Sequence, residues 1–273
     1  MPTLAEMIEA SKDRETNDAR LPGDIRARQI NMPTLAEMIE ASKQRKESES
    51  RLPGDIPARE IDRWVLSVDL GKLSDNSAAS LINHVVTGTG QWLDDVKKQR
   101  SREKELIVYR VLDLYKIPLK TPYATVARET REALKRIENT LGVKPRVVVD
   151  STGVGNAALE FFDAEMLYPH RITITGGNEL IKTDGRSWSV PKTLLVEHYE
   201  ALVDARQVHV IGDTDAAKAF RDEVKNFERQ LTSTGRPTWN AAQSHHDDLL
   251  LSVMQGCFYV ANQRSSESWE LRI

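Results

Sequence analysis

Apolar positions along residues 63–273 recur at two spacings, which predict strands and helices in turn. Short runs rich in β-branched residues predict strands over 64–69, 78–86, 106–117, 146–150, 171–175 and 208–211. Apolar residues at every third or fourth position predict helices over 123–141, 154–167, 191–205, 214–231 and 246–261. The stretch 87–105, rich in glycine and then in charge, predicts an exposed hairpin or loop.

This order of elements predicts an α/β fold. Three strands in succession, followed by alternating helices and strands and a late helix, imply a mixed sheet with helices on both faces. Binding sites in open α/β sheets form at the carboxyl ends of strands. Asp69 and Asp150 each end a predicted strand, so we expect the chemistry of this chain there.

A tandem duplication precedes this region. MPTLAEMIEASK at 1–12 recurs at 32–43 and RLPGDI at 20–25 recurs at 51–56, so both pairs share an offset of 31 residues. Each copy opens with Thr-x-x-Glu, a helix capping box, and continues with apolar residues on one helical face. We therefore divide the chain into an N-terminal arm, 1–62, and a globular domain, 63–273. The arm is expected to be either a flexible leader or a helical segment that docks on a partner.

Composition restricts the function. The chain has 38 Lys and Arg against 41 Asp and Glu, so any contact with nucleic acid must come from local basic patches. No apolar run approaches the roughly 20 residues that cross a bilayer, and the N-terminus lacks a secretory signal, so we expect a cytoplasmic protein without membrane contact. Cys257 is the only cysteine, which excludes an intramolecular disulfide and a cysteine-cluster metal site.

Several acids stand where elements are expected to begin or end. Asp69 ends a strand, Asp75 follows six residues later, and Asp150 opens the small-residue turn DSTGVG. Asp247 and Asp248 open the last predicted helix, where the helix dipole favours an acid. An N-cap role is expected for one of this pair but does not account for both.

If the two strands are neighbours and the last helix packs across them, these carboxylates converge. Converging carboxylates have raised pKa values unless a cation lies between them. Oxygen ligands without cysteine suit Mg²⁺ or Mn²⁺. Two such ions, about 3.5–4 Å apart, can activate a water and stabilise the leaving oxygen when a phosphodiester is cleaved.

These acids lie in motifs that resemble the nuclease domain of phage large terminase subunits, which is ribonuclease-H-like and related to Holliday-junction resolvases. The resemblance spans about 64–262 and includes VLSVDLGKLSDNSAAS at 65–80, VVVDSTGVGNAALEFF at 147–162 and HHDDLLLSVMQG at 245–256. It implies a ribonuclease-H-like mixed sheet and a phage-encoded hydrolase in the bacterial cytoplasm. This hydrolase would be an endonuclease that uses two Mg²⁺ or Mn²⁺ ions to cleave double-stranded DNA during packaging.

The resemblance also implies roles for individual residues. Carried over by position, Asp69, Asp150 and Asp248 are the catalytic metal ligands, Asp247 is the nearest substitute, and Asp75 is an accessory acid. Many relatives have a further acid in the last helix, where this chain reads Leu-Leu-Leu-Ser at 249–252. His246, next to the acid pair, is a less certain member of the site.

The family's full subunits carry an ATPase motor before the nuclease. Only the duplicated arm precedes the domain here, and GGNELIKT at 176–183 has Ile where a phosphate-binding G-x-x-x-x-G-K-[ST] loop needs its second Gly. We therefore expect a separate terminase ATPase, small subunit or portal to bind through 1–62.

Basic residues form two candidate contacts with the DNA backbone, one in a loop and one on a helix. Either set is equally expected as an ordinary solvated surface. The candidates are Lys97, Lys98, Arg100 and Arg102 in the loop, and Arg128 and Arg131 on the helix.

Three other functions fit part of the pattern. In an actin- or sugar-kinase-like ATPase, VDLG and DSTGVG would be phosphate loops, and nucleotide would stabilise the protein without DNA cleavage. A Holliday-junction resolvase would prefer four-way junctions to linear duplex. An inactive scaffold acting through the arm would show no metal-dependent cleavage.

Overall fold

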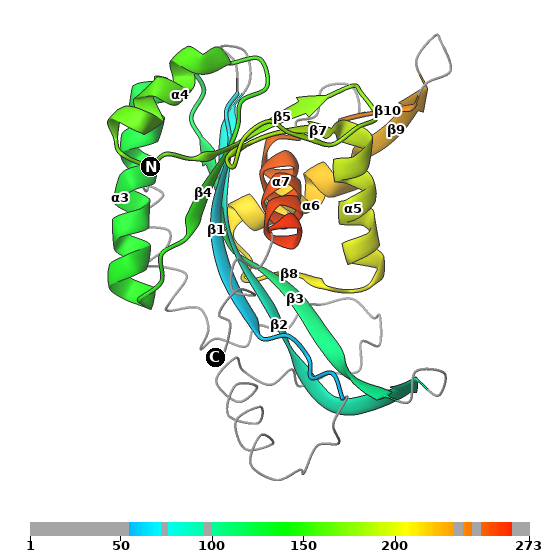
Figure 1. Ribbon diagram of the computed structural model, residues 1–273. Helices are drawn as coiled ribbons and strands as arrows, with labels where there is room; N and C mark the ends of the chain where they lie inside the picture. The colour runs from blue at the N-terminus through cyan, green and yellow to red at the C-terminus, as the bar shows by residue number, and fades with distance from the viewer. Residues whose placement is uncertain (1–54, 72–75, 96–99, 232–236, 242–246, 264–273) are drawn as a thin grey trace. The chain divides into compact units, whose positions relative to one another are not determined.

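The computed structural model describes residues 55–71, 76–95, 100–231, 237–241 and 247–263 (Figure 1). Residues 1–54 of the arm lie outside these ranges, so its predicted helices stay predictions. The helices are α3 (Tyr123–Leu141), α4 (Gly155–Ala164), α5 (Lys192–Asp204), α6 (Asp215–Lys225) and α7 (Asp248–Asn262). The strands are β1 (Ile61–Asp69), β2 (Ser77–Asp95), β3 (Arg100–Ile117), β4 (Arg146–Asp150), β5 (His170–Thr175), β6 (Ile181–Lys182), β7 (Ser187–Pro191), β8 (Val208–Val210), β9 (Phe227–Leu231) and β10 (Pro237–Ala241).

Eight of these strands form one mixed sheet in the order β6-β7-β5-β4-β1-β2-β3-β8, and β9 pairs with β10 in a separate ribbon. The pairs β1–β4, β4–β5 and β5–β7 are parallel, whereas β6–β7 is antiparallel. The α/β fold class with a mixed sheet is therefore confirmed.

Helices cover both faces of this sheet (Figure 1). α3 and α4 pack against each other on one face, while α5, α6 and α7 gather on the opposite face, with α7 in contact with α5, α6 and β4. Alternate residues of a strand point to opposite faces. Leu66 and Val68 of β1 accordingly join the core beneath α3 and α4, whereas Ser67 lies against Gly256 of α7.

The described residues form two compact units. The first contains 63–83 and 109–263, and it includes all five helices. The second contains 55–62 and 84–108. Within the second unit, Ile56 and Ser101 share a backbone hydrogen bond of 2.9 Å, and Arg59 forms an ion pair of 2.7 Å with Glu105.

The boundaries predicted from periodicity hold best where local chemistry ends an element. α3 covers 123–141 as predicted and ends at Gly142, whose φ of 69° is the left-handed conformation that glycine adopts readily. β4 covers 146–150 as predicted, and β1 begins at Ile61, earlier than expected. No helix in the described ranges is long and apolar enough to span a membrane.

Two predictions from the pattern need comment. For 87–105, predicted as a hairpin or a loop, the structure has the hairpin: the stretch belongs largely to β2 and β3, which are neighbours in the sheet, because pairing with a neighbouring strand outweighs the weak strand preference of its glycines and charges. The helix predicted over 214–231 ends at Lys225 and is followed by β9. Phe227 and Leu231 are four residues apart, a spacing that fits a helix as well as a strand, and pairing with β10 decides the outcome.

Candidate metal centre

Two buried carboxyl groups meet at the ends of neighbouring strands. The β1–β4 register pairs Val68 with Val149, so the next residues, Asp69 and Asp150, stand side by side. They are 7% and 5% exposed. A hydrogen bond joins the two carboxyls. Asp150 Oδ1 also accepts a hydrogen bond of 2.6 Å from the backbone N–H of Thr152.

The alternation along β1 directs these acids toward α7. Asp69 lies two residues beyond Ser67, which faces that helix, so both side chains point to the same side of the sheet. α7 begins there with Asp247 and Asp248, of which Asp248 is buried. The charges of both residues raise the pKa of Asp69. Strands and helix thus bring the four acids within electrostatic reach of one another, as predicted.

The electrostatics of this cluster disfavour full ionisation. Burial is the largest cause that raises the pKa of Asp69 well above its ordinary value, followed by the charges of Asp150 and Asp248. Burial also raises the pKa of Asp150, although hydrogen bonds from Thr152 oppose this shift. A divalent cation would favour the ionised form of every acid in the cluster.

Two lysines lie beside the acids. Lys116 Nζ, from β3, is 3.7 Å from Asp248 Oδ2, and Lys192 Nζ, at the first residue of α5, is 3.6 Å from Asp247 Oδ2. Lys192 also lowers the pKa of Asp150. These lysines offset part of the negative charge of the cluster.

A fifth acid, Glu223 of α6, completes the surroundings of Asp248. Glu223 Oε1 is 3.6 Å from Lys116 Nζ, and Glu223 Oε2 accepts a hydrogen bond of 3.0 Å from the backbone N–H of Leu250. Burial raises the pKa of Glu223 to about 7. Asp247 stands at the N-cap position of α7, but its side chain makes no capping hydrogen bond, so the expected capping interaction comes from Glu223.

Glu223, Lys116 and Lys192 were not predicted as members of the site. Glu223 lies on the apolar face of its helix, three residues after buried Phe220. A glutamate at an otherwise apolar position is the one sequence signal that could have predicted a role for it. Lys116 and Lys192 carry no comparable signal, because their approach to the acids depends on how the sheet and helices pack.

The other predicted residues lie outside the described ranges, in the second unit or on α3. Asp75, His246, Lys97 and Lys98 fall outside them, and for Arg100 the backbone alone is described. Arg102 is exposed and belongs to the second unit. On α3, Arg128 is exposed, whereas Arg131 forms an ion pair of 3.0 Å with Glu165.

The donor set fits a hard divalent cation. Carboxylate oxygens are the ligands that Mg²⁺ and Mn²⁺ prefer. Among the described residues, no three Asp, Glu, His or Cys side chains are already arranged around a single point as metal ligands. Asp69 and Asp150 are instead hydrogen-bonded to each other, and Asp247 and Asp248 face lysines. The burial of Asp69 and Asp150 side by side, which raises the pKa of both, favours a cation here.

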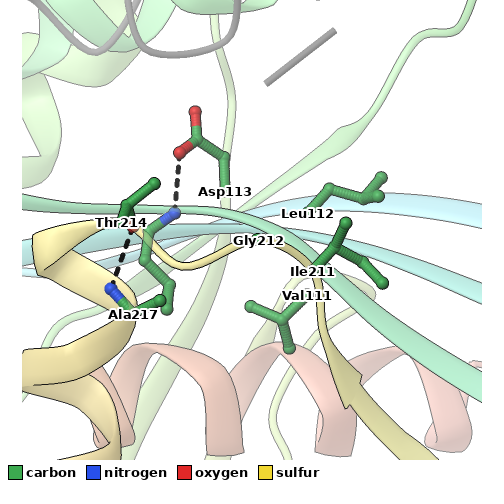
Figure 2. A pocket seen from close by; sticks show the side chains of 8 residues that line it. Val111, Leu112, Asp113, Ile211, Gly212, Thr214 and Ala217 are labelled. Carbon is green, nitrogen blue, oxygen red and sulfur yellow. Dashed lines mark hydrogen bonds between the residues drawn. The ribbon is translucent and has the colours of Figure 1, made fainter. Parts of the chain in front are cut away.

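A small pocket of about 30 Å³ lies between β3 and the segment that leads into α6 (Figure 2). Figure 2 shows Asp113 accepting a hydrogen bond from the backbone N–H of Leu114, and Thr214 capping α6 through Ala217. None of the acids of the cluster lines this pocket.

Comparisons with known proteins return structures alone. No protein-family model and no curated protein sequence matches the chain. The magnesium-bound large terminase nuclease from thermophilic phage G20c is 24% identical, covers 77% of this chain and 89% of its own, and has a TM-score of 0.47. The cobalt-bound form is 18% identical, with coverages of 75% and 92% and a TM-score of 0.48. The large terminase nuclease domain of Thermus phage P74-26 is 20% identical, with coverages of 71% and 78% and a TM-score of 0.43. All three are similar to this chain and come from the family that its motifs resemble.

Proposed function

We propose that this chain is a metal-dependent DNA endonuclease of the phage terminase nuclease type. The observation that carries the proposal is the hydrogen-bonded pair Asp69–Asp150, buried at the ends of two parallel strands with Asp248 close by. Buried acids that repel one another lower the stability of a fold, and such perturbed groups cluster at functional sites. Carboxylate oxygens from β1, β4 and α7 are suited above all to binding divalent cations.

Within this proposal Asp69, Asp150 and Asp248 hold two Mg²⁺ or Mn²⁺ ions, with Asp247 and Asp75 as further acids. The bound ions would supply an activated water and would stabilise the leaving oxygen of the scissile phosphodiester. The chain's own residues fix the geometry. The N–H of Thr152 holds the Asp150 carboxylate, and Lys116 and Lys192 keep Asp248 and Asp247 in place.

Double-stranded DNA is the proposed substrate. Lys97, Lys98, Arg100, Arg102, Arg128 and Arg131 are the proposed backbone contacts, and such contacts carry no sequence information. We also propose that the duplicated arm, 1–62, binds a separate terminase ATPase, small subunit or portal. Deleting the arm should leave cleavage intact and weaken binding to that partner, and unchanged binding would remove the arm's proposed role.

Cleavage of supercoiled plasmid in Mg²⁺ or Mn²⁺ tests the proposal. The wild type should give nicked and linear DNA, whereas Asp69→Ala and Asp150→Ala should give neither. Asp215→Ala is a matched control, because this exposed acid of α6 pairs only weakly with Lys218 across 3.4 Å. Mutants that cut as well as the wild type would exclude these acids from the reaction.

The same preparation separates the rival functions. Preference for four-way junctions over linear duplex would identify a resolvase. Thermal stabilisation by nucleotide without DNA cleavage would identify an ATPase, and no cleavage with any divalent ion would identify a scaffold.

A further inference from the structure

The start of α7 is capped by a residue from another helix. The N-cap side chain of a helix ordinarily accepts a hydrogen bond from the backbone N–H at the second or third helical residue. In α7 these positions are Asp247 for the cap and Leu250 for the third residue. The Leu250 N–H instead donates to Glu223 Oε2 at 3.0 Å, and the Asp247 carboxylate faces Lys192.

Glu223 occupies a position where its helix is otherwise apolar. The buried residues of α6 are Ala217, Phe220 and Glu223, which recur at every third position. The next residue, Val224, is 38% exposed, so α6 turns a valine to the surface and a glutamate inward. Burying a carboxyl is costly unless it is hydrogen-bonded or paired. This placement indicates that the Glu223 carboxyl forms a specific hydrogen bond or ion pair in the interior.

The partners of Glu223 all belong to the candidate metal centre. Besides the Leu250 N–H, Glu223 faces Lys116 at 3.6 Å, and Lys116 in turn faces Asp248 at 3.7 Å. One side chain from α6 therefore fixes the first turn of α7 and the lysine beside Asp248. If the Asp247 carboxylate capped its own helix, it would accept the hydrogen bond from the Leu250 N–H and would be less able to bind a metal ion.

We infer that Glu223 is a positioning residue, which caps α7 in place of Asp247 and so leaves both adjacent aspartates for the metal centre. The inference rests on the proposed function. Glu223 acts through Leu250 and Asp248 and is not itself a metal ligand. Outer partners that orient metal ligands typically change metal affinity about tenfold to a hundredfold when they are lost.

Three variants of the full chain test this role. Glu223→Ala removes the acceptor for the Leu250 N–H, Glu223→Gln keeps an amide oxygen that can accept it, and Asp222→Ala is the control on the same helix. Asp222 is suited to this comparison because its side chain is 69% exposed and pairs with Lys225 at 3.3 Å. The readouts are hydrogen exchange at the Leu250 amide without metal, Mn²⁺ binding followed by electron paramagnetic resonance, and plasmid cleavage.

Glu223→Ala should speed exchange at Leu250 and weaken Mn²⁺ binding about tenfold or more. Glu223→Gln and Asp222→Ala should keep slow exchange and bind Mn²⁺ within about threefold of the wild type, a smaller change than the loss of an outer partner causes. A glutamine variant as impaired as the alanine variant would overturn the inference, because a metal ligand or a pure charge effect would then explain Glu223. Mn²⁺ binding by Glu223→Ala equal to that of the wild type would also overturn it.

These measurements separate this inference from the proposed function. A wild type that binds Mn²⁺ but cuts no DNA removes the proposed function, while Leu250 exchange and Mn²⁺ binding still decide the role of Glu223. If Glu223→Ala does not fold, fast exchange at Leu250 in folded Glu223→Gln overturns the inference, and slow exchange with intact Mn²⁺ binding supports it.

Discussion

The carboxyls of Asp69 and Asp150 are hydrogen-bonded to each other across two adjacent parallel strands. Such a bond requires a proton on one of the two acids, and burial raises the pKa of both. A divalent cation would take the place of that proton. The pair therefore links metal binding to protonation.

Without metal, the protein should become less stable as the pH rises above 4. The pKa of Asp69 is raised well above its ordinary 3.8, so between these two values the folded state binds more protons than the unfolded state, and stability falls with rising pH. Thermal melts from pH 4 to 8 in chelator should show this fall, and Asp69→Asn should reduce it and raise the Tm at pH 8. Adding Mg²⁺ at pH 8 should raise the Tm of the wild type but not of Asp69→Asn. A pH-independent Tm would contradict the proton assigned to this pair.

The two acids at the start of α7 should differ in their importance. Asp248 is buried and raises the pKa of Asp69 more than Asp247 does, whereas Asp247 is half-buried beside Lys192. Asp248→Ala should lower the cleavage rate at saturating metal by more than about a hundredfold, beyond the range for outer partners. Asp247→Ala should cost about tenfold. Equal losses in single-turnover cleavage would show that both acids serve the centre alike.

Tyr123 tethers the segment that follows Asp69. Its hydroxyl donates to the carbonyl of Gly71 at 2.9 Å, and the Gly71 N–H donates to Ser77 Oγ at 3.0 Å. Tyr123→Phe should lower the free energy of unfolding by about 1 kcal/mol and should lower cleavage, because the end of β1 is held less firmly. Tyr168→Phe, at a residue that is 53% exposed, is the control in urea unfolding and cleavage assays. If Tyr123→Phe and Tyr168→Phe have the same free energy of unfolding and the same cleavage rate, the Tyr123 hydrogen bond does not hold this segment in place.

DNA binding should depend on salt in proportion to the phosphates neutralised. Each phosphate contact contributes about 0.9 to the slope of log affinity against log salt concentration. Replacing Lys97, Lys98 and Arg100 with alanine should therefore lower the magnitude of this slope by about 2.7 if all three contact phosphates. Fluorescence anisotropy on duplexes of unrelated sequence measures the slope. A slope equal to that of the wild type would place the DNA elsewhere on the protein.

The sequence predicted the position of a residue best where neighbouring residues along the chain determine that position. Asp69 and Asp150 end β-branched runs, and Gly142 marks a helix end, so all three could be placed without tertiary information. The lysines and Glu223 depend on packing between distant elements, since 27 residues separate Glu223 from the Leu250 N–H that it accepts. Phe227 and Leu231 fit two periodicities, and the choice between them rests on a strand that follows later in the chain.

Gly256 should control how closely α7 approaches the sheet, and hence where Asp248 lies. A Cβ at this position would stand 2.5 Å from Ile82 Cδ1 and 3.0 Å from Ser67 Cβ. Ile82 can turn its terminal methyl aside, but Ser67 Cβ is fixed to the strand, so Gly256→Ala should push the helix outward and cost about 1–3 kcal/mol of stability. The same shift would move Asp248 away from Asp69, so Mn²⁺ binding should weaken as well. Gly176→Ala is the matched control, because a Cβ there meets no atom within 4 Å. Adding Ile82→Val to Gly256→Ala should restore part of the stability. If Gly256→Ala has the same Tm and the same Mn²⁺ affinity as Gly176→Ala, the packing of α7 on the sheet tolerates a methyl group at this position and the prediction is wrong.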